Sequence, residues 1–345
     1  MDIVSIASTV LHLAGIPHGR VSVIGMSRSQ PGQLLAASLV FVDDKTEPTL
    51  FVKLTTDMNS ADALRAEFDN LSRLAGGLAE PLRSTVPAPV WFGELEGVTV
   101  LAETALSGRR MKNFPPDRYF CSSRFRRHLG NVVEWLHGFH LSMGDGGAAG
   151  DPARRLRDEL DVFRRDFRSS SRLDELLRET EDHLTRRAVP LGPWHGDFCT
   201  ANVLVPDDRR VHVIDWEQPS RDCWPLADLL YFISSLWCIP HAKGPQAQAA
   251  NYRRMFFGEH HLSAQIVDAV RGLAAPLDVA PVDVLPLSVI TWVVYANLKR
   301  RLLTQPGDTG AEPADHWPLI LLDGEACLNL ELLAEHRDDY RLARL

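Results

Sequence analysis

The chain has 345 residues, of which 45% are apolar, and its formal net charge is −8. This length supports a large core divided over two lobes, and the acidic balance argues against a nucleic-acid partner. Its five cysteines are scattered and form no C-x-x-C pair, which is typical of reduced thiols in a cytoplasmic protein.

The first hundred residues predict a sheet with few helices. Residues 4–13 have the pattern of a short amphipathic helix and lack the basic region of a signal peptide. Residues 61–77 repeat apolar side chains at helical spacing and end in two glycines. β-Rich runs bounded by turns predict a meander of antiparallel strands at 20–25, 34–42, 49–54 and, as a pair, 87–103.

After Gly108 the pattern changes to long helices. An apolar face runs along 127–143, and a charged helical stretch follows at 154–187, interrupted near 169–171. Residues 226–345 are mostly helical, and no run approaches the length of a membrane span, so we expect no membrane segment. We therefore predict an N-lobe over 1–105 and a helical C-lobe over 106–345.

The stretch WHGDFCTANVLV, residues 194–205, places Asp197 and Asn202 before a strand. A short turn then leads into VHVID, so a hairpin returns the chain and brings Asp215 close to Asn202. Amide and carboxylate oxygens are ligands that Mg²⁺ accepts in small number, while phosphates and water complete its coordination. A second carboxylate can accept a proton from an attacking hydroxyl. This combination is typical of phosphoryl transfer.

The ordered motif HGDFCTAN…VIDW resembles the catalytic segment of the aminoglycoside phosphotransferase and choline kinase superfamily, relatives of protein kinases. The resemblance implies a bilobal, protein-kinase-like α+β fold with a small antiparallel-sheet N-lobe and a larger, mainly helical C-lobe. It also implies a lysine on the third strand, a glutamate on the next helix, and an aspartate on the helix after D-W. Lys53, Glu67 and Asp228 stand at these places.

The resemblance implies a role for individual residues of such a site. Asp197 is the expected proton acceptor, and Asn202 and Asp215 are the expected Mg²⁺ ligands. Lys53, held by Glu67, is expected to contact the nucleotide phosphates.

Further residues are assigned to nucleotide binding and to support. The backbone of Glu103 and Ala105 is expected to contact the adenine. The loop between Gly25 and Gly32 lacks G-x-G-x-x-G, so Ser27 and Ser29 with their amides are the expected phosphate contacts. His195 and Asp228 are expected to support the site by hydrogen bonds.

The expected activity is O-phosphorylation of a small polar molecule by ATP, with GTP as the alternative donor. The acceptor is foremost an aminoglycoside-type compound, and alternatively a sugar, an amino alcohol or a biosynthetic intermediate. A pseudokinase-like nucleotide-binding module is the alternative of another class, against which the complete set of Lys53, Asp197, Asn202 and Asp215 argues. We expect no nucleic-acid or membrane partner.

Overall fold

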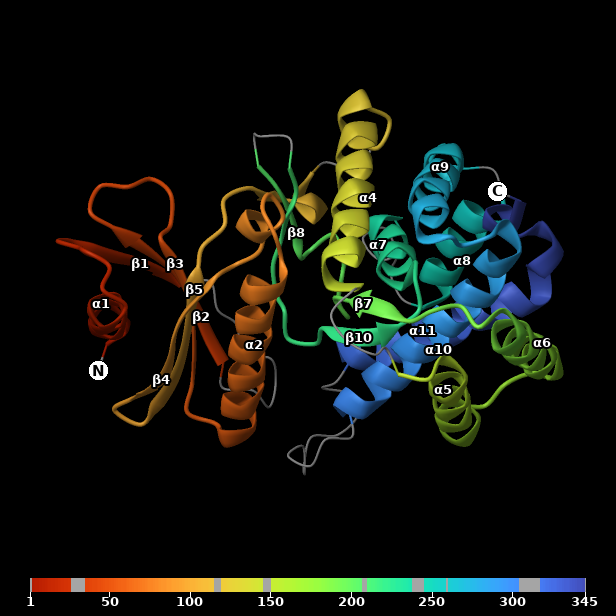
Figure 1. Cartoon of the computed structure of the whole chain (residues 1–345), viewed down its shortest axis with the longest axis horizontal. Coiled ribbons are helices and arrows are strands. Elements are labelled where there is room, and N and C mark those ends of the chain that lie inside the picture. Colours follow the sequence, from red (N-terminus) through yellow and green to blue (C-terminus); the bar gives the residue numbers. More distant parts are fainter. Residues whose placement is uncertain are drawn as a thin grey trace. The chain divides into compact units, whose positions relative to one another are not determined.

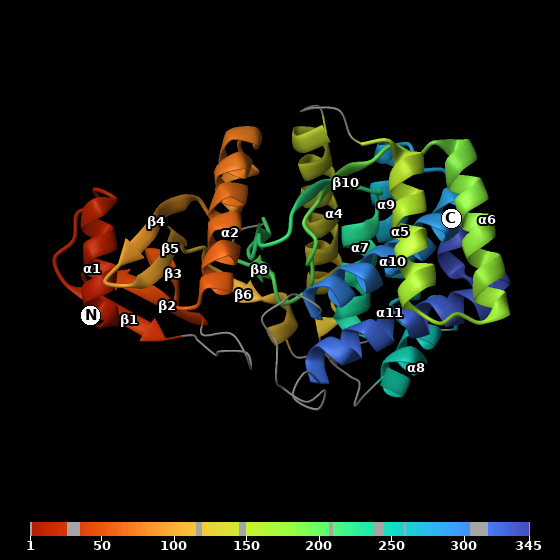
Figure 2. The ribbon, with the colours of Figure 1, turned by 90° about the horizontal axis from the view of Figure 1, so that it is seen from below.

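The computed structural model describes residues 2–25, 35–114, 119–144, 150–206, 210–237, 245–258, 260–303 and 317–344. The chain forms two compact units: unit 1 is Met1–Arg109 with Asn202–Pro219, and unit 2 is Arg110–Ala201 with Ser220–Leu345 (Figures 1 and 2). The chain first passes from unit 1 to unit 2 after Arg109, whereas the sequence predicts a boundary after residue 105. The segment Asn202–Pro219, in contrast, clusters with unit 1, although the sequence places it within the helical part of the chain.

Unit 1 contains the predicted antiparallel meander. Its five strands follow the order β1-β2-β3-β5-β4, and neighbouring strands in this order pair antiparallel. Lys53 on β3 lies opposite Ala37 of β2 and Leu101 of β5, so it is on the central strand of the sheet. The strands are β1 (Val21–Gly25), β2 (Leu35–Val42), β3 (Leu50–Thr55), β4 (Pro89–Leu95) and β5 (Val98–Thr104).

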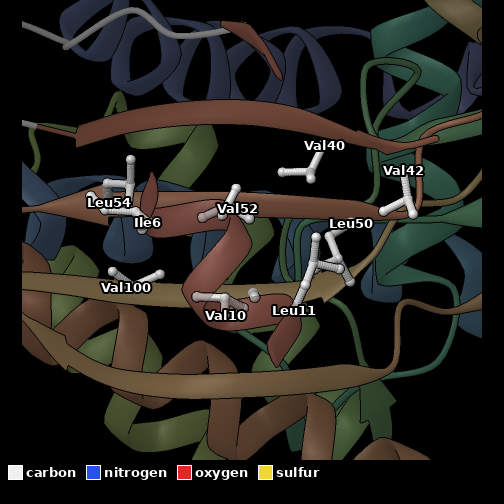
Figure 3. Packing of buried hydrophobic residues seen from close by; sticks show 11 residues of the cluster. Ile6, Val10, Leu11, Val40, Val42, Leu50, Val52, Leu54 and Val100 are labelled. Carbon is white, nitrogen blue, oxygen red and sulfur yellow. The ribbon is translucent and has the colours of Figure 1, made fainter. Parts of the chain in front are cut away.

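Helices α1 (Ile3–Leu13) and α2 (Met58–Gly77) cover opposite faces of this sheet (Figure 1). The side chains of Asp2 and Asp57 cap their N-termini by accepting backbone N–H groups. The apolar face of α1 packs on alternate residues of the strands, including Val52 and Leu54 of β3 (Figure 3). Since strand side chains alternate between faces, Lys53 points to the face that α2 covers.

A hairpin completes unit 1. Strand β8 (Val203–Val205) pairs antiparallel with β9 (His212–Val213), and Val203 lies opposite Val213. The Ile214 backbone N–H donates to the Asn202 carbonyl at 3.0 Å, which extends the pairing by one step. The predicted hairpin is therefore present, and it places the residue before Asp215 against Asn202. The short strand β6 (Arg109–Arg110) lies at the first boundary of unit 1. The short helix η1 (Arg83–Thr85) precedes β4.

Unit 2 is mainly helical (Figure 2). Ser170, within the predicted interruption, caps α6 by accepting the Leu173 N–H, so the charged stretch forms two helices. Its helices are α4 (Ser123–Gly144), α5 (Pro152–Asp166), α6 (Ser171–Arg187), α7 (Ala227–Trp237), α8 (Pro245–Phe256), α9 (Ser263–Ala274), α10 (Val284–Leu303) and α11 (Trp317–His336). The short elements are η2 (Met111–Asn113), β7 (Gly192–Trp194), β10 (Ser220–Cys223), η3 (Ala275–Leu277), η4 (Pro281–Asp283), η6 (Arg337–Asp339) and η7 (Arg341–Arg344), and β7 pairs with β10.

The helical segment Pro281–Arg301, which includes most of α10, is long and apolar enough to cross a membrane. The expectation that no segment reaches this length is therefore wrong for this part of the chain. However, 72% of its most apolar stretch is buried in the structure, where α10 packs against α5, α6, α7 and α11. Its apolar composition fits the role of a central core helix, which is surrounded by other helices rather than by water.

Candidate active site

Lys53 is the centre of an ionic cluster in unit 1. Its ammonium donates to both carboxylate oxygens of Glu67, at 2.8 and 2.7 Å, and to Asp215 Oδ1 at 3.1 Å. Glu217 Oε1 lies 3.5 Å away. The Lys53 side chain is 7% exposed and that of Glu67 is 0% exposed, whereas Asp215 and Glu217 are 38% and 46% exposed. The predicted Lys53–Glu67 pair thus forms the buried side of the cluster, and the Asp215 side is open to water.

The cluster contains more negative than positive groups. Burial lowers the pKa of Lys53, but the surrounding carboxylates, with Asp215 first, outweigh it and raise that pKa well above its usual value. Burial raises the pKa of Glu67 despite the attraction of Lys53. Burial also raises the pKa of Glu103 well above normal, and repulsion from Glu67 adds to the effect. This excess of negative charge favours the binding of a further cation.

Backbone contacts within unit 1 fix the Asp215 segment. Asn70, on the same helix as Glu67, donates from Nδ2 to the Trp216 carbonyl at 3.0 Å. Asp215 itself has a left-handed backbone with φ of 73°, a conformation that aspartate tolerates better than most residues. A rare conformation held by surrounding contacts is common where a side chain must be aimed at a ligand.

These donors fit Mg²⁺ as it is used with nucleotides. The described residues include no group of three or more His, Cys, Asp and Glu side chains arranged for a metal. Nucleotide-bound Mg²⁺ needs only one or two protein oxygens, because phosphates and water supply the others. The half-exposed Asp215 carboxylate, beside an excess of negative charge, is such a donor.

The loop around Asp197 belongs to unit 2, where Asp228 braces it. The buried Asp228 carboxylate accepts the backbone N–H groups of His195 at 2.8 Å and Gly196 at 3.3 Å. His195 is fully buried, and its Nδ1 accepts the Asp197 N–H at 3.2 Å. Gly196 has a φ of 88°, in the region that favours glycine, so this position in H-G-D suits the turn of the backbone.

The same helix, α7, also holds the far end of the loop. Ser235 Oγ accepts the Thr200 N–H at 2.9 Å, while the Thr200 hydroxyl donates to the Ser235 carbonyl at 3.3 Å. Asp228 and Ser235 therefore fix the backbone on both sides of Asp197. The Asp197 side chain remains 36% exposed. The arrangement gives an accessible carboxylate on a backbone that cannot easily move.

Burial raises the pKa of Asp228 from 3.8 to about 7, although the two backbone N–H groups act in the opposite direction. No cation accompanies this carboxylate within salt-bridge distance among the described residues. Its role in bracing the loop therefore depends on hydrogen bonds rather than on charge pairing.

The remaining sequence predictions concern nucleotide binding. Ser27 and Ser29 lie outside the described residues. The Ala105 N–H donates to the Thr49 carbonyl at 3.2 Å, which uses this donor in unit 1. Glu103 stands on β5 opposite Phe51, and adenine binding by its backbone stays a prediction.

Sequence reasoning missed the side chain of Glu103. It is 3% exposed, and its Oε2 has no hydrogen-bond partner in the described part of the chain. Strand alternation identifies the face: Val100 and Ala102 pack under α1, so Glu103 must point to the Lys53 face. Asn70 and Lys299 were also missed, because neither stands in a local motif.

Comparison with known proteins agrees with this geometry. Residues 33–264 match the model of the phosphotransferase enzyme family, and the chain belongs to that family. It is thus a small-molecule phosphotransferase that acts on hydroxyl groups. No curated protein matches the sequence.

Solved structures share the fold at low sequence identity. Choline kinase LicA from Streptococcus pneumoniae is 13% identical, with a TM-score of 0.55 over 95% of this chain and 98% of that one. A choline/ethanolamine kinase family protein from Mesorhizobium loti is 13% identical, with a TM-score of 0.50 over 98% of both chains. Aminoglycoside phosphotransferase APH(4)-Ia, solved with ADP and hygromycin B, is 13% identical, with a TM-score of 0.51 over 94% and 98%. The predicted kinase-like α+β fold is confirmed.

Proposed function

We propose that the protein transfers the γ-phosphoryl group of ATP to a hydroxyl of a small polar molecule in the cytoplasm. The observation that carries the proposal is the pairing of Lys53 with both Glu67 and Asp215 in unit 1. This arrangement supplies a fixed cation for phosphate and a carboxylate for Mg²⁺. The braced Asp197 loop of unit 2 supports the same reaction.

In the proposed reaction the acceptor oxygen forms a bond to the γ-phosphorus while the bond from that phosphorus to the β-phosphate oxygen breaks. ADP leaves, and the hydroxyl proton passes to the Asp197 carboxylate. Lys53 stabilises charge on the phosphates, and Glu67 keeps the ammonium in place. Asn202 and Asp215 would hold Mg²⁺, which when bound neutralises charge on the phosphates.

The nucleotide-binding residues are part of this proposal. Ser27 and Ser29 are proposed phosphate contacts, and the backbone of Glu103 and Ala105 is proposed to contact the base. Since the Ala105 N–H is engaged with Thr49, its carbonyl is the available group for such a contact. ATP is the proposed donor, and GTP is the alternative.

The test is a coupled ADP-release screen with aminoglycosides, sugars, hydroxy acids and amino alcohols, run with the wild type and with Asp197→Ala. We expect Asp197→Ala to lower turnover at least about a thousandfold while Mg²⁺-dependent nucleotide binding persists, because only the proton acceptor is lost. Undiminished turnover in this variant would refute the role of Asp197. A nucleotide thermal shift that needs no Mg²⁺, without phosphate transfer to any acceptor, would instead indicate a binding module.

Aminoglycosides and amino alcohols are both in the screen because the structural neighbours include both an aminoglycoside phosphotransferase and choline kinases. Expression in a drug-sensitive host separates them. Raised tolerance to an aminoglycoside supports a resistance enzyme, whereas unchanged tolerance across a broad panel supports a metabolic kinase.

A further inference from the structure

A lysine of α10 lies beside the proposed proton acceptor in unit 2. Lys299 Nζ is 3.8 Å from Asp197 Oδ1, and the Lys299 side chain is 11% exposed. This distance is too long for a hydrogen bond. The ammonium makes no hydrogen bond to any described residue, so its three donors remain available there.

The packing of α10 explains why this lysine stands at the catalytic loop. Tyr295, one helical turn earlier on the same face, stacks on Tyr231 of α7 with ring centroids 4.1 Å apart. Its hydroxyl accepts the Trp194 indole N–H at 3.3 Å, and Trp194 directly precedes His195. The helix face that supports the loop therefore also carries Lys299, which distinguishes it from a mobile surface lysine.

The nearby acidic residue Glu159 does not neutralise Lys299. The Glu159 carboxylate accepts from Asn297 Nδ2 at 2.6 Å and pairs with Arg155 at 2.8 Å and Arg301 at 3.7 Å. Asn297 and Arg301 stand two residues on either side of Lys299, so they point to a different side of α10. Among the carboxylates of the described residues, Asp197 is the one within salt-bridge distance of Lys299.

A hydroxyl that gives its proton to Asp197 must lie within a few ångströms of this ammonium. An acceptor with a cationic group beside that hydroxyl meets like-charge repulsion, whereas an oxyanion at the same place gains both attraction and hydrogen-bond donors. We propose that Lys299 is a specificity-determining residue that binds a carboxylate or phosphate of the acceptor, so that the substrate is an anionic hydroxy compound. This inference rests on the proposed function and favours a metabolic acceptor over an aminoglycoside.

The test compares acceptors that share a three-carbon skeleton and differ in charge. They are glycerate, glycerol 3-phosphate, glycerol and 3-amino-1,2-propanediol. ADP release gives kcat and KM for the wild type, Lys299→Met and Lys299→Arg, with Arg300→Met as the control that removes the neighbouring cation of α10. Saturation-transfer NMR in the presence of Mg-ADP measures binding of the same four compounds.

We expect the wild type and Arg300→Met to favour an anionic member over glycerol at least about tenfold in kcat/KM and to bind the amine most weakly. Lys299→Met should lose this preference mainly through KM, and Lys299→Arg should retain part of it, which a purely structural lysine would not explain. Preference for glycerate alone or for glycerol 3-phosphate alone distinguishes a carboxylate from a phosphate subsite.

Three results would overturn the inference. The amine could bind as tightly as the anionic acceptors or more tightly, the preference for an anionic acceptor over glycerol could survive in Lys299→Met, or neither anion could bind. In each case Asp197-dependent turnover of another acceptor would leave the proposed function standing. Conversely, Lys299-dependent binding of an anion without phosphorylation of any acceptor would support the anion subsite and contradict the proposed reaction.

Discussion

The Lys53 cluster of unit 1 and the Asp228 scaffold of unit 2 stabilise functional groups in different ways. In unit 1 the ammonium of Lys53 contacts the carboxylates of Glu67, Asp215 and Glu217 within 3.5 Å. In unit 2 the Asp228 carboxylate accepts two backbone N–H groups. The first arrangement depends on charge and carries surplus negative charge; the second depends on hydrogen bonds to the backbone.

This difference suits what each region must do. The net charge of a cluster with surplus negative groups changes when a cation and a nucleotide bind. The electrostatic energy of the cluster therefore depends on the ligand. A backbone bound by a buried carboxylate keeps its conformation with or without a ligand. Substitutions that remove a charge should therefore separate the two regions by the size and the pH dependence of their effects.

The largest effect on stability is expected from Lys53→Met. The variant leaves the fully buried Glu67 without its counter-charge, so the free energy of unfolding should fall by about 3–5 kcal/mol. Adding Glu67→Gln removes the stranded charge and should restore a substantial part of that loss. Urea unfolding of the wild type and both variants measures this. A loss below about 1 kcal/mol in Lys53→Met would show that the cluster is not held by this pair.

Asp228→Asn should change how stability depends on pH. The folded chain holds the Asp228 proton up to about pH 7, whereas the unfolded chain releases it near its ordinary value of 3.8. The folded state therefore binds more protons between these values, and wild-type stability contributed by Asp228 falls as pH rises from about 4 to 7, by on the order of 3 kcal/mol. The variant lacks this slope.

Urea unfolding at several pH values gives the difference between the wild type and Asp228→Asn. Asp283→Asn is the control: burial raises the pKa of Asp283, but bonds from Arg187 and His183 outweigh it and lower that pKa. Its stabilisation is present above the unfolded pKa and is lost at acid pH, so its difference curve has the opposite sign. Parallel curves for the two variants would contradict the burial of Asp228 as an ionisable group.

A smaller gain is expected from Glu103→Gln. Burial raises the pKa of Glu103, so the folded chain keeps this proton where the unfolded chain releases it, and stability falls as pH increases above about 4. The amide does not titrate in this range, so the variant should be more stable than the wild type at pH 8, by at least about 1 kcal/mol, and nearly equal to it at pH 4. The exposed Glu94→Gln on β4 is the control, and a pH-independent difference would contradict this expectation.

The smallest effect is expected at the surface. Glu80 and Arg83 form a pair at 3.1 Å, and both side chains are 53% exposed. Because solvent screens such a pair, Glu80→Ala should leave the midpoint of thermal unfolding unchanged within error. A clear shift of this midpoint would mean that exposed ion pairs also contribute to the stability of this fold.

The sequence predicts the parts of the site that local pattern determines. The Lys53–Glu67 pair is an implication of the family resemblance, and the expected pairing of two strands predicts that the Asp215 segment returns to Asn202. The structure contains both contacts. The division into a sheet-containing part and a helical part is predicted from the change of sequence pattern, from strands to helices, near Gly108. The catalytic, metal and nucleotide roles of these residues stay predictions.

The parts that the sequence could not predict depend on packing between distant segments. Lys299 reaches Asp197 because Tyr295 packs on Tyr231, and no local motif marks that helix face. The segment Asn202–Pro219 is part of unit 1, where Lys53 binds Asp215 and Asn70 binds the Trp216 carbonyl. A single boundary drawn along the sequence cannot represent such contacts. Alternation along β5 could have identified the Glu103 side chain.

The apolar character of α10 has a consequence for how the protein is produced. Helix α11 packs against α10 and follows it in the chain. A growing polypeptide therefore displays a segment hydrophobic enough for a bilayer before its covering helix has left the ribosome. Versions shortened before Trp317 should accumulate as insoluble or membrane-associated material, whereas chains that include α11 should stay in solution.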